Sequence, residues 1–295
     1  MANRMKVLIA YDGSECANDA LDDLNWAGLP AEVDCKVLSV LESWLPPPSG
    51  LAIVEHIDHR QEFMTLAAQA ARRVTLAHPA WEVSAEIGVG SPASVILEKA
   101  DEWNPDLIVL GAHGRSALGR LVFGSVSQKV LHEATGSVRI ARERAAESER
   151  AAGPAKLLLG FDGSPSAKES VRIVTGRHWP NGCEIRLVYG AWPNPGFDFE
   201  PGVGQIADWI AEEDLRIKTW IEAEARDLRA AGFQASTIIK AEEPKRLLLD
   251  EAESWKPDCI FVGARGLGRL ERLRLGSVSS AVAARAHCSV EVVRA

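Results

Sequence analysis

The sequence contains no long hydrophobic run. Its apolar stretches, such as 107–110, are far shorter than the run of about 18 residues that a membrane-spanning helix requires. The apolar stretch 7–10 ends at Tyr11 and Asp12, which is too early for the hydrophobic region of a secretory signal. We therefore expect a cytoplasmic protein with no membrane partner.

The sequence also has no excess of positive charge and no paired cysteines. The 33 lysines and arginines are outnumbered by 41 aspartates and glutamates, which gives a formal net charge of −8. A chain of this sign is poorly suited to cover a phosphate backbone, so we expect no nucleic-acid partner. The five cysteines are scattered and form no Cys-x-x-Cys pair, and the seven histidines show no metal-ligand spacing. This pattern predicts free, buried thiols and no metal site.

The main feature that the sequence does contain is an internal repeat. The segment Lys6–Ser14 reappears as Lys156–Ser164, and Trp103–Gly114 reappears as Trp255–Gly266. Between the copies, residues 142–154 are charged, rich in alanine and end in Gly-Pro, a composition typical of a solvated connector. A chain of 295 residues with 46% hydrophobic residues can form two globular domains. We place these domains at 1–145 and 154–295.

Each half alternates short strand-like runs with helix-like stretches, the pattern of parallel strands joined by crossover helices. The expected strands of the first half are Lys6–Ala10, Cys35–Leu41, Glu82–Ile87, Leu107–Leu110 and Val138–Ala141. Those of the second half lie near Lys156, Glu184, Ala235, Cys259 and Val290. Helices of the first half are expected over Ser14–Trp26 and Ile57–Ala77, from Pro92 and from Gly124. The sequence thus predicts an α/β fold of two tandem, doubly wound domains, each with a five-stranded parallel sheet.

A glycine motif follows the fourth expected strand of each half, at the edge of the sheet where such folds bind ligands. Both copies keep the spacing Gly-x₂-Gly-x₉-Gly-Ser, with Gly111, Gly114, Gly124, Ser125, Val126 and Ser127 in the first and Gly263, Gly266, Gly276, Ser277, Val278 and Ser279 in the second. Glycine lets backbone amides approach a phosphate, and the start of a helix offers unpaired amides and the positive end of its dipole. The motif therefore predicts a phosphate site in each half, where the hydroxyls of Ser125 and Ser127 can add donors. Alternatively, the glycines serve turns and close strand–helix packing, and Ser125 caps a helix.

Together with the first strand and its VLIAYDGS sequence, this motif resembles the universal stress protein family in its tandem form, over nearly the whole chain. The resemblance implies Rossmann-like domains with strand order 3-2-1-4-5 that pair through their last strands into an internal pseudo-dimer, and it leaves a dimer of chains open. It implies that ATP binds in each half, with Mg or Mn held through the phosphates. Site residues carried over from the family, besides those of the glycine motif, are Asp12, Val40, Asp162 and Val188. The first loop itself adds Arg115, whose positive charge suits a phosphate.

The resemblance also assigns roles to these residues. Asp12 and Asp162 match the acidic residue near the ribose and the metal–phosphate region, and Val40 and Val188 match the residue whose backbone contacts the edge of the adenine. From the sequence alone, Asp12 could alternatively be a turn residue before Gly13, since Asp-Gly is a common turn pair, and both roles can coexist. The family commonly has proline before the last strand, where this chain has Ser137 and Ser289, a difference expected to affect turn geometry only.

We expect a nucleotide-binding stress-response regulator with an unknown protein partner. The alternatives are a slow ATPase or phosphotransfer enzyme, because the same cradle could polarise a γ-phosphate, and an interaction scaffold without nucleotide. Neither glycine loop carries a duplicated acidic residue or glutamine that could orient an attacking water. The sequence therefore predicts at most slow hydrolysis and identifies no catalytic residue.

Overall fold

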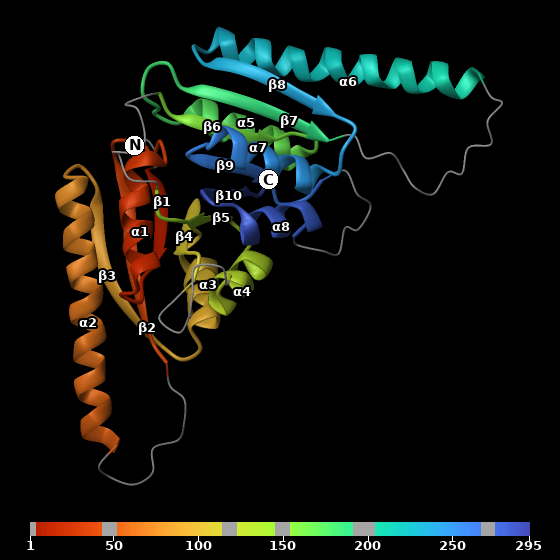
Figure 1. Ribbon diagram of the computed structural model, residues 1–295. Helices are drawn as coiled ribbons and strands as arrows, with labels where there is room; N and C mark the ends of the chain where they lie inside the picture. Colours follow the sequence, from red (N-terminus) through yellow and green to blue (C-terminus); the bar gives the residue numbers. More distant parts are fainter. Residues whose placement is uncertain (1–3, 43–51, 114–122, 145–153, 191–203, 267–274) are drawn as a thin grey trace.

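The computed structural model describes residues 4–42, 52–113, 123–144, 154–190, 204–266 and 275–295 (Figure 1). The first half consists of β1 (Met5–Ala10), α1 (Glu15–Asp23), a 3-10 turn (Leu24–Trp26), β2 (Val33–Leu41), α2 (Ala52–Ala77), β3 (Glu82–Val89), α3 (Pro92–Trp103), β4 (Leu107–Gly111), α4 (Ser125–Glu133) and β5 (Ser137–Ala141). The second half consists of β6 (Lys156–Gly160), α5 (Pro165–Gly176), β7 (Glu184–Gly190), α6 (Gly204–Ala230), β8 (Gln234–Lys240), α7 (Pro244–Trp255), β9 (Cys259–Gly263), α8 (Ser277–Arg285) and β10 (Ser289–Val293). The alternation of strands and helices is the one that the sequence predicts.

All ten strands form one sheet, in the order β3-β2-β1-β4-β5-β10-β9-β6-β7-β8. Within each half the strands are parallel, and their order is 3-2-1-4-5, which confirms the expected fold. The halves meet where β5 pairs antiparallel with β10, so that Ile140 lies opposite Val290 and Val138 opposite Val292. The winding direction reverses between β1 and β4, and again between β6 and β9. The carboxyl ends of these strands are therefore the place to look for a ligand site.

Local sequence signals explain why the equivalent helices of the two halves begin and end alike. Helices α1 and α5 begin after Ser14 and Ser164, whose hydroxyl oxygens each accept a hydrogen bond from an amide of the first turn. Helices α3 and α7 have proline in the first turn and end at residues in the left-handed conformation, Asn104 (φ 49°) and Lys256 (φ 52°). The same signals at equivalent positions give both halves the same framework.

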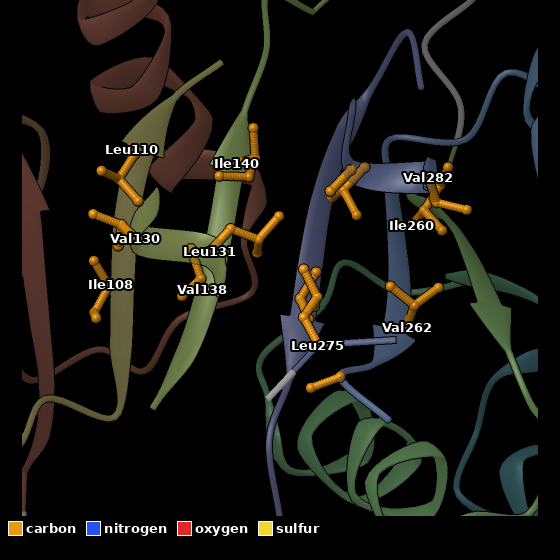
Figure 2. Packing of buried hydrophobic residues seen from close by; sticks show 14 of the residues in the cluster. Ile108, Leu110, Val130, Leu131, Val138, Ile140, Ile260, Val262, Leu275 and Val282 are labelled. Carbon is orange, nitrogen blue, oxygen red and sulfur yellow. The ribbon is translucent and has the colours of Figure 1, made fainter. Parts of the chain in front are cut away.

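The core has one continuous cluster and two separate ones. Helices α3, α4, α7 and α8 cover the face on which buried residues of both halves form one cluster, including Ile108, Ile140, Ile260 and Val282 (Figure 2). On the other face, α1 and α2 cover a cluster of the first half, and α5 and α6 cover one of the second half. The continuous cluster joins the two halves into one body around the central strands.

Charged side chains are buried on the other face of this junction. Arg139 of β5 lies directly opposite Glu291 of β10, and both are fully buried. Arg139 Nε donates to Asp23 Oδ2 at 2.5 Å, and its Nη1 donates to Glu291 Oε2 at 3.2 Å. Arg177 Nη1 also donates to Glu291 Oε2, at 2.8 Å. Two guanidinium groups thus balance two carboxylates from elements of both halves.

Two further expectations concern thiols and membranes. The cysteines are free, and Cys35, Cys183 and Cys259 are buried, whereas Cys16 and Cys288 keep some solvent exposure. The expectation of buried thiols is therefore right for three of them and wrong for two. Among the helices that the structure describes, none combines the length and the apolar character needed to span a bilayer.

Candidate functional site

A cavity of about 410 Å³ opens at the carboxyl ends of β6, β7 and β9 in the second half, beside the start of α8. This volume is within the usual range for small-molecule sites, roughly 300 to 1,000 Å³. Its lining includes every site residue that the sequence predicts for this half, namely Asp162, Val188, Gly263, Gly266, Gly276, Ser277, Val278 and Ser279. Residues separated by more than a hundred positions therefore meet around one cavity.

The cavity lining combines apolar and polar residues from different elements. Val188 of β7, Val262 of β9, and Pro244 and Leu248 of α7 provide apolar side chains. Ser277 at the start of α8, together with Asp162 and Arg265, provides polar groups. A ligand with one flat, apolar part and one anionic part would match both kinds of lining.

Helices α4 and α8, like α3 and α7, begin without a side-chain cap. Their N-cap residues are Gly124 and Gly276, and neither provides a side-chain cap. Ser125 and Ser277 are the first helical residues, so the alternative that Ser125 caps its helix is wrong. The first-turn amides of α8 border the cavity without a capping side chain, and the helix dipole adds positive potential there.

The glycines of the motif have more than one purpose. The amides of Gly124 and Gly276 donate to the carbonyl oxygens of Ala112 and Ala264, at 2.9 and 2.7 Å, so each of these two amides already has a hydrogen-bond acceptor within the protein. A Cβ on Gly263 would lie 2.5 Å from Ser166 Oγ, and one on Gly111 would lie 2.6 Å from the carbonyl oxygen of Cys16. Close strand–helix packing therefore requires Gly111 and Gly263, as the alternative interpretation of the motif predicts.

The second serine of each motif has a structural contact. Ser127 Oγ donates to the carbonyl oxygen of Gly111 at 2.8 Å, and Ser279 Oγ donates to that of Gly263 at 2.6 Å. The sequence interpretation treats the hydroxyl of Ser127 as a phosphate donor, whereas in the structure its hydrogen is already donated to a carbonyl. These bonds fix the start of each helix to the end of the neighbouring strand.

The two predicted aspartates adopt the same turn. Asp12 Oδ1 accepts a hydrogen bond from the amide of Ser14 at 3.0 Å, and Asp162 Oδ1 accepts one from the amide of Ser164 at 3.0 Å. The glycine that follows each aspartate has positive φ, 78° at Gly13 and 75° in the second half, where a side chain would be strained. The turn role is thus present in both halves. Asp162 also lines the cavity, so the two roles that the sequence allows coexist in position.

The pairing of Val40 with Val188 as equivalent residues is wrong. The amide of Phe161 donates to the carbonyl of Val188, and the amide of Tyr11 donates to the carbonyl of Leu38, both at 2.9 Å. Val188 is therefore the counterpart of Leu38, and the counterpart of Val40 lies two residues after Val188, at Gly190. A shift of two residues keeps the same face of a strand, so an apolar pattern alone does not reveal it.

The described site residues of the first half lie near the ends of β1, β2 and β4 and at the start of α4, as in the second half. One pair of residues near them differs between the halves. Cys16 Sγ lies 3.2 Å from His113 Nε2, where the second half has Ser166 and Arg265. Burial raises the pKa of the Cys16 thiol, which favours its neutral form. The predicted residues Gly114 and Arg115 lie outside the described residues.

The sequence interpretation missed several residues that line the cavity, including Tyr189, Gly190, Pro244 and Leu248. Pro244 had a usable signal, because it repeats Pro92 at the same place in the first copy. Tyr189 and Gly190 had no such signal, since the register of their strand relative to its neighbour decides which residue reaches the cavity.

Comparisons with known proteins agree with the repeat. The model of the universal stress protein family matches residues 3–142 and 155–294. A universal stress protein of Mycobacterium tuberculosis is 28% identical, over 98% of this chain and 96% of its own length. One of Mycolicibacterium smegmatis is 26% identical, over 99% of this chain and 98% of its own. The crystal structure of a universal stress protein from Archaeoglobus fulgidus has the same fold, with a TM-score of 0.65, 21% identity, and coverage of 98% of this chain and 96% of that one.

Proposed function

This chain belongs to the universal stress protein family, with one family domain in each half, and from that premise we propose that it is an ATP-binding regulator of the stress response. The observation that carries the proposal is the cavity of the second half. There the uncapped start of α8, the Asp162 turn and a set of apolar side chains face one space. Nucleotide occupancy would set the stability of the chain or its choice of a protein partner.

Each part of the ligand has a matching group in the cavity lining. The first-turn amides of α8 suit phosphate oxygens, and Arg265 adds positive charge beside them. The apolar residues Val188, Leu248 and Val262 suit a base, and Asp162 is near enough to the same space to contact a ribose or a cation. The equivalent elements of the first half support a second site.

A divalent cation would enter this site through the nucleotide. Mg²⁺ prefers oxygen ligands and usually keeps several waters, so phosphate oxygens with one carboxylate fit its chemistry. Asp162 supplies a carboxylate to the cavity lining. When bound, Mg²⁺ or Mn²⁺ would neutralise phosphate charge. Asp162 would orient the cation, and the α8 amides would hold the phosphate oxygens.

Calorimetry with Mg-ATP on the full chain tests the proposal. Ser277→Asp and Ser125→Asp place a negative charge at the first helical position, which favours the helix but repels a phosphate. We expect each variant to remove the site of its own half and the double variant to bind no ATP. Ser91→Asp is the matched control, because it adds the same charge at the start of α3, where the second half naturally has Glu243.

Two results would overturn the proposal. One is unchanged stoichiometry and affinity in the Ser125→Asp, Ser277→Asp double variant. The other is a native chain that neither binds Mg-ATP nor releases adenine nucleotide when it is denatured after purification. The second result would favour the scaffold alternative.

A further inference from the structure

An arginine of the first half binds the end of a helix in the second half. Arg142 follows β5, and its Nη1 donates to the carbonyl oxygen of Cys288 at 3.3 Å. Its Nη2 donates to the carbonyl oxygen of Ala283, which lies in the last turn of α8. The amide of Arg142 also donates to Ser289 Oγ at 3.1 Å. The start of β10 and the end of α8 are therefore held by the residue that follows the last strand of the other half.

The same contact is repeated in the opposite direction. Arg294 follows β10, its Nη1 donates to the carbonyl oxygen of Gly136 at 2.8 Å, and its Nη2 donates to that of Leu131 in the last turn of α4. The amide of Arg294 donates to Ser137 Oγ at 3.2 Å. Ser137 and Ser289 thus receive hydrogen bonds from the opposite half, a role that the sequence interpretation did not foresee. The contacts of Arg142 and Arg294 thus form the same arrangement twice, once on each side of the junction.

The two helices bound in this way are the ones that begin at the candidate nucleotide sites. Helix α8 presents its first-turn amides to the cavity of the second half, while its last turn is bound by Arg142 of the first half. The last carbonyls of a helix have no partner within the helix and carry the negative end of its dipole. A guanidinium group satisfies both requirements, because it donates hydrogen bonds and carries positive charge. Each arginine therefore steadies a short helix of nine residues at the end away from the ligand.

We propose that Arg142 and Arg294 are positioning residues that set the nucleotide affinity of the opposite half. Arg142 would act on the site of the second half through α8, and Arg294 would act on the site of the first half through α4. The proposal rests on the proposed function, because it concerns the same two sites. It adds that neither site is complete without the other half of the chain.

The test uses full-length chains in which only one site is intact. Ser125→Asp leaves the second-half site, and Ser277→Asp leaves the first-half site. Adding Arg142→Gln should weaken Mg-ATP binding in the Ser125→Asp chain, by roughly two- to thirtyfold from the usual size of charge effects at helix ends. The same substitution should leave affinity unchanged in the Ser277→Asp chain. Arg294→Gln should give the mirror-image result.

Two controls separate positioning from a general loss of stability. Arg142→Lys keeps the positive charge but loses the planar pair of donors, so it should restore part of the lost affinity. Arg177→Gln removes the ion pair with Glu291 at the same junction but touches neither helix end, so it should affect the two sites equally. Equal losses at both sites in Arg142→Gln, or a loss confined to the first-half site, would overturn the proposal.

A ligand-free measurement keeps this proposal distinct from the proposed function. In hydrogen exchange of the chain without nucleotide, Arg142→Gln should increase exchange in α8 and leave α4 unchanged, and Arg294→Gln should do the reverse. If the native chain binds no ATP, the proposed function fails, and the exchange pattern alone decides whether each arginine fixes the helix of the opposite half. Unchanged exchange in both helices would refute the positioning role.

Discussion

Replacing Arg139 with methionine tests the buried charges at the junction most directly. Arg139 is fully buried. It donates two hydrogen bonds to Asp23, at 2.5 and 3.1 Å, and one to Glu291 at 3.2 Å. Methionine has a similar length but no charge, so in the variant the buried Asp23 carboxylate loses both hydrogen bonds from the guanidinium and keeps the one from Ser289 Oγ at 2.8 Å. Glu291 keeps its contacts with Arg177. The main cost is therefore one uncompensated buried carboxylate.

Breaking a buried ion pair by removing one partner usually costs about 3 to 5 kcal/mol. We expect a loss of this size in the free energy of unfolding of Arg139→Met, measured by urea denaturation at neutral pH. The double variant Arg139→Met, Asp23→Asn removes the stranded charge as well, and it should recover part of the loss. Arg172→Met is the matched control, because the Arg172 side chain is 74% exposed in its pair with Glu169. That control should change stability by about 1 kcal/mol or less.

Two outcomes would contradict an uncompensated charge on Asp23 as the cause of the loss. If Arg139→Met lost less than about 1 kcal/mol, the buried network would contribute no more than a surface pair. If the double variant were as unstable as the single one, the stranded charge on Asp23 would not be the source of the loss. Either result would show that an uncompensated carboxylate on Asp23 is not what destabilises the variant.

Three other predictions concern packing, pH and turnover. Gly263→Ala should destabilise the chain by about 1 to 3 kcal/mol in thermal unfolding, because the added Cβ would lie 2.5 Å from Ser166 Oγ. The control Gly176→Ala, whose Cβ would have nothing within 4 Å, should not destabilise it, and equal effects would contradict the packing role. Burial opposes ionisation of Glu251, but hydrogen bonds from Lys240 and Arg186 outweigh this effect and lower the pKa of the carboxyl group. Glu251→Gln should therefore reduce the free energy of unfolding at neutral pH, and the difference from the native chain should disappear as the pH falls through the lowered pKa. A difference that persists in acid would contradict this. Steady-state ATP hydrolysis should be far below the roughly 1 to 100 s⁻¹ of kinases, and turnover in that range by a pure sample would favour an enzyme.

Much of the fold was predictable because the sequence contains two copies of the same pattern of strands, helices and motifs. The repeated first strand and glycine motif identify two doubly wound domains, and the ends of those strands converge on the cavity that includes Asp162 and Ser277. The counterpart of Val40, which is Gly190 and not Val188, was not predictable in the same way, because strand register depends on pairing with neighbours. The structural contact of the Ser127 hydroxyl was not predictable for a related reason. Only the fold shows that the carbonyl of Gly111 lies within reach of it.

The junction contacts had a signal that an alignment of the two copies could have revealed. Arg139 and Glu291 occupy equivalent positions with opposite charges, in strands that are otherwise uncharged. A charge reversal between two copies is a reason to ask whether the positions face each other. Arg142 and Arg294 also occupy equivalent positions of the two copies, but an arginine near a strand end is compatible with many surface roles, so the repeat alone does not predict their reciprocal contacts.

The opposition of Arg139 and Glu291 has a consequence for the order in which the chain is made. A ribosome adds about 5 to 20 residues per second, so the first half waits on the order of ten seconds or more before the second half is complete. During that interval β5 is an open sheet edge with a guanidinium at its centre. Two such first halves on neighbouring ribosomes would bring Arg139 against Arg139, because each residue faces its own counterpart across the antiparallel pair. The half that carries the matching carboxylate therefore pairs with this edge more favourably than a second copy of the first half does.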